Sequence, residues 1–143
     1  MQIQTRLFGT IEIDDNETLY FPSGIPGFEN VKKFVLLGRQ EAGVPFFWLQ
    51  GIDDPDLAFV VTDPFYIHPD YFVDVDDEEI TELDIKDTEH VLTISIVTIP
   101  DKIENMSVNL RAPILINTRN NTGKQIVMKN DTFPIKYYIM NKK

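Results

Sequence analysis

The run Val91-Leu92-Thr93-Ile94-Ser95-Ile96-Val97-Thr98-Ile99 is the longest strand-like stretch of the chain, and it indicates the fold class. Leu92, Ile94 and Ile96 alternate with Thr93 and Ser95, as expected for a strand with one buried face. The alternation breaks at Val97. This break predicts either a β-bulge that bends the strand or a strand that becomes buried on both faces.

Shorter runs rich in Val, Ile, Phe, Tyr and Thr recur on both sides of this stretch, about a dozen residues apart. Turn-forming Gly, Pro, Asn or Asp residues separate them. These predicted strands are residues 2–7, 10–13, 33–37, 46–50, 58–62, 112–118, 125–129 and 135–140. The polar connector 120–123, which contains Asn and Gly, predicts a hairpin between the strands 112–118 and 125–129.

Helical signals are confined to one segment, where Asp77 is predicted to cap a short helix that carries Ile80 and Leu83 on one side. No linker or repeat interrupts the chain. We therefore expect a mostly β fold: one small antiparallel β-barrel-like domain spanning residues 1–143, with one or two short helices and a frayed C-terminal end.

Charge is distributed unevenly, and the formal net charge is −10. Residues 70–89 contain ten carboxylates and one cation, whereas residues 102–143 contain eight cations and two carboxylates. An acidic protein lacks the cations that neutralise nucleic-acid phosphates, so direct nucleic-acid binding is not expected. The densest acidic cluster could attract a cationic partner or could only solvate the surface. Its members are Asp74, Asp76, Asp77, Glu78 and Glu79.

No constellation of catalytic or metal-binding residues is visible. The chain has no cysteine, its two histidines are 22 residues apart, and no serine lies in a nucleophile elbow. Residues 74–85 resemble a calcium loop, but Glu79 stands where Gly is needed and Ile85 where Glu is needed. We predict a protein that is not an enzyme and has no metal or cofactor. Without a signal peptide or a long apolar run, we also predict a cytoplasmic protein that avoids membranes.

The nonapeptide Phe21-Pro22-Ser23-Gly24-Ile25-Pro26-Gly27-Phe28-Glu29 predicts a rigid, irregular loop, because two prolines and two glycines constrain its backbone. It resembles the F-P-x-G-I-P-G-F signature of the flagellar assembly factor FliW family. Two further segments resemble that family in the same order: Phe47-Trp48-Leu49-Gln50 followed by Pro55-Asp56-Leu57-Ala58-Phe59-Val60-Val61-Thr62-Asp63-Pro64, and Asn109-Leu110-Arg111-Ala112-Pro113-Ile114-Leu115-Ile116-Asn117 followed by Gly123-Lys124-Gln125.

The resemblance implies a regulator of flagellin production in the bacterial cytoplasm. Proteins of this family bind flagellin and also bind CsrA, the carbon storage regulator that represses translation of flagellin mRNA. We expect the acidic cluster to weaken RNA binding by CsrA through its field. A flagellin-specific export chaperone that does not bind CsrA is the alternative function.

Two sets of residues are candidates for contact with flagellin, whose terminal amphipathic helices need an apolar groove with a polar rim. The first set lies in the loop: Phe21, Pro22, Gly24, Ile25, Pro26, Gly27, Phe28 and Glu29. Its apolar members could instead be core residues. The second set lies in the third family segment: Asn109, Arg111 and Pro113. The sequence does not separate these possibilities.

Overall fold

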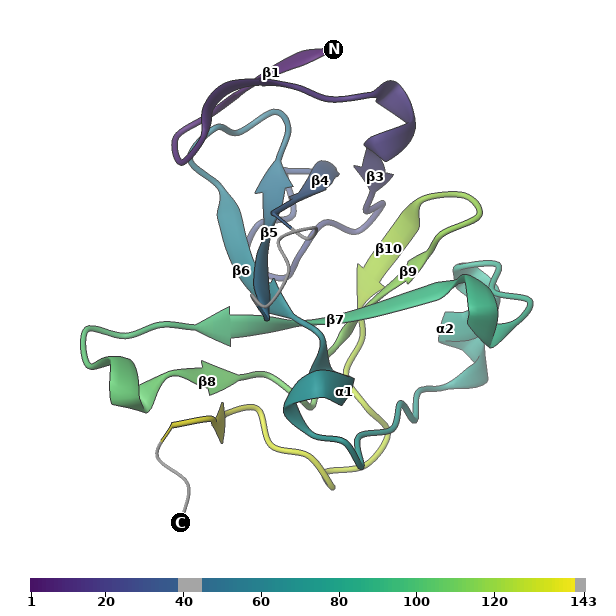
Figure 1. Cartoon of the computed structure of the whole chain (residues 1–143). Helices are drawn as coiled ribbons and strands as arrows, with labels where there is room; N and C mark the ends of the chain where they lie inside the picture. Colours follow the sequence, from purple (N-terminus) through teal and green to yellow (C-terminus); the bar gives the residue numbers. More distant parts are fainter. Residues whose placement is uncertain (39–44, 141–143) are drawn as a thin grey trace.

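The computed structural model describes residues 1–38 and 45–140 (Figure 1). The predicted frayed end, residues 141–143, lies outside the described part. The strands are β1 (Gln2–Thr5), β2 (Gly9–Glu12), β3 (Leu19–Tyr20), β4 (Lys33–Leu37), β5 (Phe46–Gly51), β6 (Ala58–Thr62), β7 (Val91–Thr98), β8 (Ser107–Val108), β9 (Ile114–Asn117), β10 (Thr122–Gln125) and β11 (Tyr137–Tyr138). Two short α-helices, α1 (Pro64–Ile67) and α2 (Asp77–Glu82), join them, with 3₁₀ turns at Asp15–Glu17, Thr88–His90 and Ile103–Asn105.

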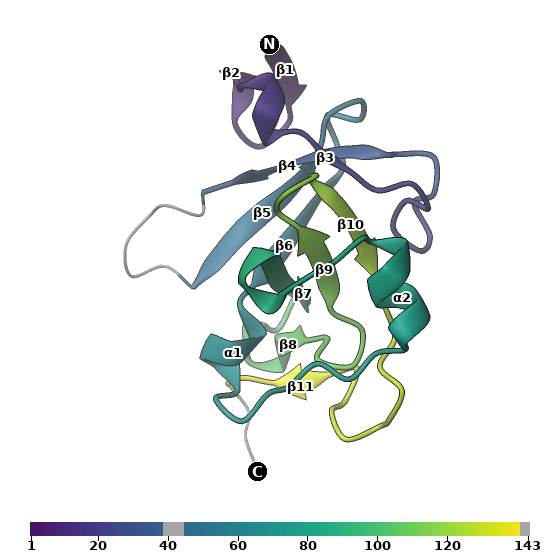
Figure 2. The ribbon, with the colours of Figure 1, turned by 90° about the vertical axis from the view of Figure 1, so that its right-hand side faces the viewer.

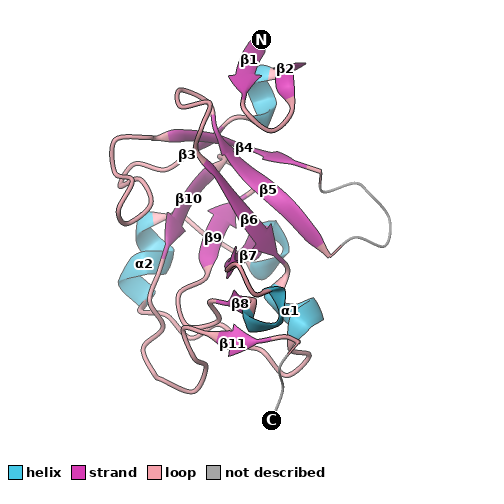
Figure 3. Ribbon diagram, turned by 90° about the vertical axis from the view of Figure 1, so that its left-hand side faces the viewer, coloured by secondary structure: helices cyan, strands magenta, loops and turns pink. Residues whose placement is uncertain are grey.

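The main sheet curls until its last strand, β9, pairs with β7. Its order is β11-β8-β7-β6-β5-β4-β3-β10-β9, and an additional pairing of β7 with β9 closes the circuit (Figure 3). Pairing is antiparallel throughout the described strands except between β10 and β3, which run parallel and meet at Thr122 and Tyr20. The predicted mostly β, barrel-like fold with short helices is confirmed, with this one parallel contact as an exception.

Strand β7 holds the barrel together by changing partner along its length. Val91 to Ile94 pair with β9, Ser95 and Ile96 pair with β6, and Val97 and Thr98 pair with β8. Ile94 packs in the barrel core, whereas Val97 packs in a second core. The break in alternation therefore reflects a strand that becomes buried on both faces, the second of the two predicted alternatives.

Four apolar clusters fill the part of the molecule that the structure describes. The barrel core contains Phe21, Ile25, Phe34, Leu49, Ile94 and Ile116 among others. The second core surrounds Tyr71, Leu110 and Phe133 and includes Val108 of β8. A third cluster fixes the β1–β2 hairpin, and a fourth packs α2 against β9 through Leu83 and Leu115. The hairpin and β11 lie at opposite ends of the molecule (Figures 1 and 3).

The predicted hairpin forms with a shifted register. Residues 118–121 make the turn, because the side-chain oxygens of Asn117 and Asn120 accept hydrogen bonds from the backbone N–H groups of Arg119 and Thr122. Asn121 takes a positive φ of 56°. These asparagines end the turn early, so β10 begins at Thr122, inside the predicted connector. Beyond Gln125 the predicted strand 125–129 continues only as an irregular segment that still hydrogen-bonds to Pro113 and Arg111.

Helix α2 matches the predicted helix, but Asp76, not Asp77, is its N-cap. Asp77 occupies the first helical turn together with Glu78 and Glu79. Helix α1 was not predicted from the sequence. Its start follows a recognisable signal, because the Asp63 carboxylate accepts from the backbone N–H of Phe65 and Pro64 stands at the first helical position.

Candidate protein-binding surfaces

The loop 21–29 combines a buried base with an exposed tip. Phe21 and Ile25 are only 0% and 1% exposed and belong to the barrel core, where the Phe21 ring packs edge to face on Phe34. Gly24 and Gly27 have positive φ values of 66° and 90°. The loop thus consists of tight turns that these two glycines make possible.

The tip of this loop is available to a partner. Pro26, Gly27, Phe28 and Glu29 are exposed, and the Phe28 ring rests on Phe59 with a centroid separation of 5.2 Å. The Glu29 carboxylate accepts from the backbone N–H of Gly27 at 3.0 Å, and this hydrogen bond lowers the pKa of Glu29. Pro22 is also exposed, whereas Gly24 is buried.

The segment 109–113 lies mostly inside the fold. The Asn109 side-chain oxygen accepts from the backbone N–H of Ala112 at 3.0 Å, which stabilises a local turn. Asn109 and Arg111 are half-buried, and Pro113 is buried. These positions leave little surface for a partner. Leu110 of this segment packs in the second core, whereas Phe21 and Ile25 of the loop 21–29 pack in the barrel core.

The acidic cluster divides into anchored and free carboxylates. Lys124 of β10 donates to Glu79 at 2.7 Å and to Glu82 at 2.9 Å, which ties α2 to the barrel (Figure 2). Asp74 accepts from the side-chain amide of Asn130. Among residues 1–38 and 45–140, no ion pair or hydrogen bond engages the exposed carboxylates of Asp76, Asp77 and Glu78. These three carboxylates therefore project charge into solvent from the N-cap and first turn of α2.

This ion triad shifts the pKa values of Glu82 and Lys124. The hydrogen bond from Lys124 lowers the pKa of Glu82, and the hydrogen bonds to Glu79 and Glu82 raise the pKa of Lys124. Both shifts favour the charged forms. The triad thus holds α2 against β10 through two ion pairs.

A groove beside the acidic cluster was not predicted. It has a volume of about 650 Å³ and runs between the segment 71–88 and the outer face of β7 and β9. Its apolar lining comes from Phe65, Tyr71, Phe72, Val73, Val75, Ile80, Ile85, Val91 and Leu115. The sequence signal was the interleaving of Tyr71, Phe72, Val73, Val75, Ile80 and Ile85 with the carboxylates of residues 70–89.

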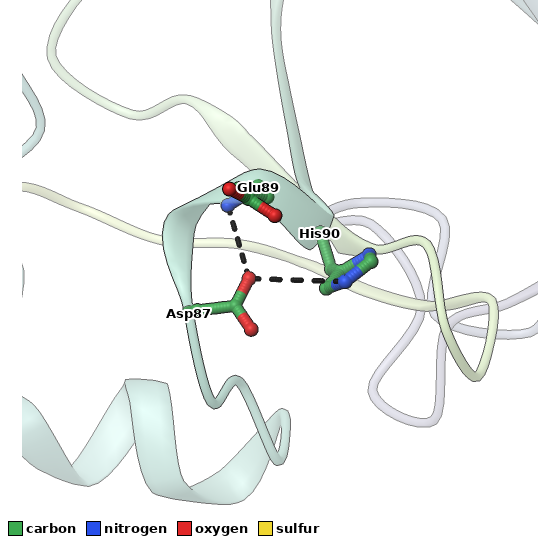
Figure 4. Close-up of side chains that lie close together, drawn as sticks. All are labelled: Asp87, Glu89 and His90. Carbon is green, nitrogen blue, oxygen red and sulfur yellow. Dashed lines mark hydrogen bonds and ion pairs between the residues drawn. The ribbon is translucent and has the colours of Figure 1, made fainter.

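Three side chains with metal-ligand chemistry meet near one end of this groove. Potential ligand atoms of Asp87, Glu89 and His90 lie within 4.8 Å of one another. Asp87 accepts from the backbone N–H of Glu89 at 3.1 Å and lies 3.9 Å from Nε2 of His90 (Figure 4). Asp87 is the N-cap of the 3₁₀ turn Thr88–His90, and this capping accounts for the grouping.

Within the described ranges, the helices are too short to cross a lipid bilayer.

Comparison with known proteins agrees with the fold and the motifs. A family model described as FliW protein matches residues 2–139. The chain is 46% identical over 140 residues to a flagellar assembly factor FliW of Caldanaerobacter subterraneus subsp. tengcongensis, an alignment that covers 98% of this chain and 93% of the relative. It is 47% identical, with the same coverage, to a flagellar assembly factor FliW of Thermoanaerobacter pseudethanolicus.

A solved structure supports the same assignment. A crystal structure of the flagellar assembly factor FliW matches this chain with a TM-score of 0.89 at 36% identity, and the match covers 100% of this chain and 99% of that chain. The family model, the relatives and the fold all agree with the linked motifs found in the sequence. The chain therefore belongs to the FliW family of flagellar assembly factors.

Proposed function

We propose that this chain is a cytoplasmic regulator that binds flagellin and antagonises the translational repressor CsrA, coupling flagellin synthesis to filament assembly. Membership of the FliW family over residues 2–139 carries the proposal. In this reading, free protein removes CsrA from flagellin mRNA, and newly made flagellin captures the protein and restores repression. The protein acts by binding alone, with no catalysis and no cofactor.

The exposed carboxylates of α2 support a mechanism for the antagonism. Asp76, Asp77 and Glu78 are not neutralised by any cation in the described part of the chain, and the whole protein has a net charge of −10. A protein with this charge, docked on CsrA, places negative potential near the path of the RNA. Phosphate binding weakens wherever the separation stays within about one Debye length, roughly 8–10 Å at moderate salt.

Calorimetric titration tests the proposed function directly. The protein is titrated with CsrA and with flagellin from the same organism, first separately and then in competition. We expect binding to both, with flagellin displacing CsrA. Binding to flagellin alone would identify a flagellin-specific export chaperone, and binding to neither would overturn the proposed function while leaving the fold and family unchanged.

Charge neutralisation tests the mechanism. We expect the triple variant Asp76→Asn, Asp77→Asn, Glu78→Gln to bind CsrA as before and to compete less well with RNA, most clearly at low salt. Neutralising three exposed carboxylates elsewhere provides the matched control: Asp53→Asn, Asp56→Asn, Asp101→Asn. The measured quantity is the constant for inhibition of RNA binding to CsrA. If this constant is unchanged in the first variant, or changes equally in both variants, the proposed local field of the α2 carboxylates is contradicted.

A further inference from the structure

The groove between the segment 71–88 and strands β7 and β9 has no role in the mechanism above. We propose that it docks an amphipathic helix of a partner protein, with large apolar side chains on one face and Lys or Arg beside them. The inference rests on the proposed function only in requiring that the chain works by binding proteins. It adds the location of one binding site and the chemistry of its occupant.

The lining of the groove suits an apolar helix face. Its volume of about 650 Å³ is of the size that encloses several side chains, and Phe65, Phe72, Ile80 and Ile85 contribute to its walls. Phe65 and Phe72 are 43% and 46% exposed, which is high for rings of this size. An exposed apolar concavity with a polar rim is typical of an interaction site.

At β9, the floor of the groove is closed to binding by strand addition. Val91 and Thr93 belong to β7, which at this point pairs with β9, and Leu115 belongs to β9, which pairs with β7 on one side and β10 on the other. Strand β9 therefore has neighbours on both edges, and its backbone groups are used within the barrel. A partner on this part of the floor is recognised through side chains, which is how an amphipathic helix lies in a groove.

The rim defines the charge of the occupant. Asp74 and Asp87 line the groove, and the cation in the lining, Lys86, is paired with Asp84 at 3.0 Å. The exposed carboxylates of Asp76 and Asp77 stand at the start of α2, next to this rim. The net negative potential favours a helix with basic flanks and disfavours one with acidic flanks.

The walls are held in place before any partner arrives. The Tyr71 hydroxyl donates to the backbone carbonyl of Leu110 at 2.7 Å, and Phe72 packs on Phe133 with a centroid separation of 5.0 Å. On the other side, the Asn117 side-chain amide donates to the carbonyls of Leu83 and Asp84 at 2.9 and 3.1 Å, fixing the end of α2. A preformed groove binds with a smaller ordering cost.

Synthetic peptides test the inference without depending on the identity of the partner. The probes are fluorescein-labelled amphipathic helices of about 18 residues, or about five turns, with a Leu and Ile face flanked by Lys. The comparison peptides replace Lys by Glu or scramble the apolar face. Fluorescence anisotropy measures their affinity for the full chain. We expect the Lys peptides to bind and both comparison peptides to bind at least tenfold more weakly.

Matched variants locate the binding. We expect Phe72→Ala to weaken the Lys peptides at least tenfold, as buried aromatic anchors do, whereas Tyr66→Ala removes a 70% exposed ring of α1 outside the groove and leaves the affinity unchanged. Thr93→Phe fills the floor and gives a second variant if Phe72→Ala lowers stability. Asp87→Asn keeps the capping oxygen and should weaken binding, with Glu104→Gln as the charge control.

Several outcomes would overturn the inference. The inference fails if the Lys peptides do not bind, or if the scrambled peptides bind as tightly as the Lys peptides. It also fails if Phe72→Ala and Tyr66→Ala change the affinity for the Lys peptides equally, or if the groove binds only a small apolar dye. Titrating the same variants with flagellin and CsrA separates the two conclusions. Groove-dependent peptide binding without flagellin or CsrA binding would refute the proposed function alone; binding of both proteins without peptide binding would refute the groove alone.

Discussion

Replacing Gly24 by Ala should destabilise the fold far more than replacing Gly27 by Ala, although both glycines lie in one loop and both have positive φ. A Cβ atom at residue 24 would lie 2.6 Å from Cα of Glu29 and 2.9 Å from its carbonyl oxygen, whereas a Cβ at residue 27 meets nothing within 4 Å. Comparing the two variants therefore separates the cost of a positive φ at alanine from the cost of contact between the new Cβ atom and neighbouring backbone.

The magnitudes follow from these two contributions. Placing Ala in the left-handed region costs about 1–2 kcal/mol, and about 0.4–1 kcal/mol is recovered from the less flexible unfolded chain. We expect Gly27→Ala to lower the free energy of unfolding by about 1 kcal/mol. Gly24→Ala adds an overlap with backbone that only a shift of the loop can relieve, a further cost of about 1–3 kcal/mol. Its total loss should be about 2–4 kcal/mol.

Urea unfolding followed by circular dichroism measures both losses, and the slope with urea checks that the denatured states are comparable. Thermal unfolding should show a midpoint lowered by about 3 °C for each kcal/mol in a protein of this size. Equal losses for the two variants, within about 0.5 kcal/mol, would refute the reasoning, because they would show that the approach of Gly24 to Glu29 has no energetic consequence.

Two further predictions concern the anchors of the groove and of α2. Tyr71→Phe should lower the free energy of unfolding by about 1–3 kcal/mol, because it leaves a buried carbonyl without its donor, whereas Tyr138→Phe on the surface should have no effect; urea titration compares them. Lys124→Met should remove about 0.5–1 kcal/mol and change the pH dependence of stability. Because the pKa of Glu82 is lowered in the folded state, Glu82 stabilises the fold at pH above its ordinary pKa of 4.5, and this contribution is lost as the pH falls through the folded-state pKa. Because the pKa of Lys124 is raised in the folded state, Lys124 stabilises the fold at pH below its ordinary pKa of 10.5, and this contribution is lost as the pH rises through the folded-state pKa. Urea titrations at acidic to alkaline pH measure the free energy of unfolding at each pH. In the Lys124→Met variant, this free energy should no longer fall at the acidic and alkaline ends for the reasons above. A dependence on pH that matches the parent protein would contradict the role of the triad.

Local patterns predicted the strands well where residues alternate and where turns flank them. The predicted strands 33–37 and 58–62 coincide with β4 and β6. The register of β10 was missed, because asparagine side chains closed the turn before the connector ended. The break at Val97 was visible in sequence, but only the second core showed that burial on both faces caused it.

The candidate site was harder to predict for a physical reason. The loop 21–29 was identified as rigid, yet its apolar residues divide between core and surface according to contacts with distant strands, as Phe21 with Phe34 and Phe28 with Phe59 show. The groove needs α1, the segment 71–88 and two strands in one place. No local pattern encodes that assembly. The family resemblance supplied the proposed partners, whereas the composition alone indicated only an acidic binding protein.

Closure of the barrel has a consequence for how the chain folds during synthesis. The parallel contact joins Tyr20 to Thr122, which are about 100 residues apart, and β7 cannot complete its pairing until β9 has been made. Until then β3 and the first half of β7 expose unpaired edges on the nascent chain. Such edges can pair with other chains, so the folding yield should fall as the rate of synthesis and the temperature rise.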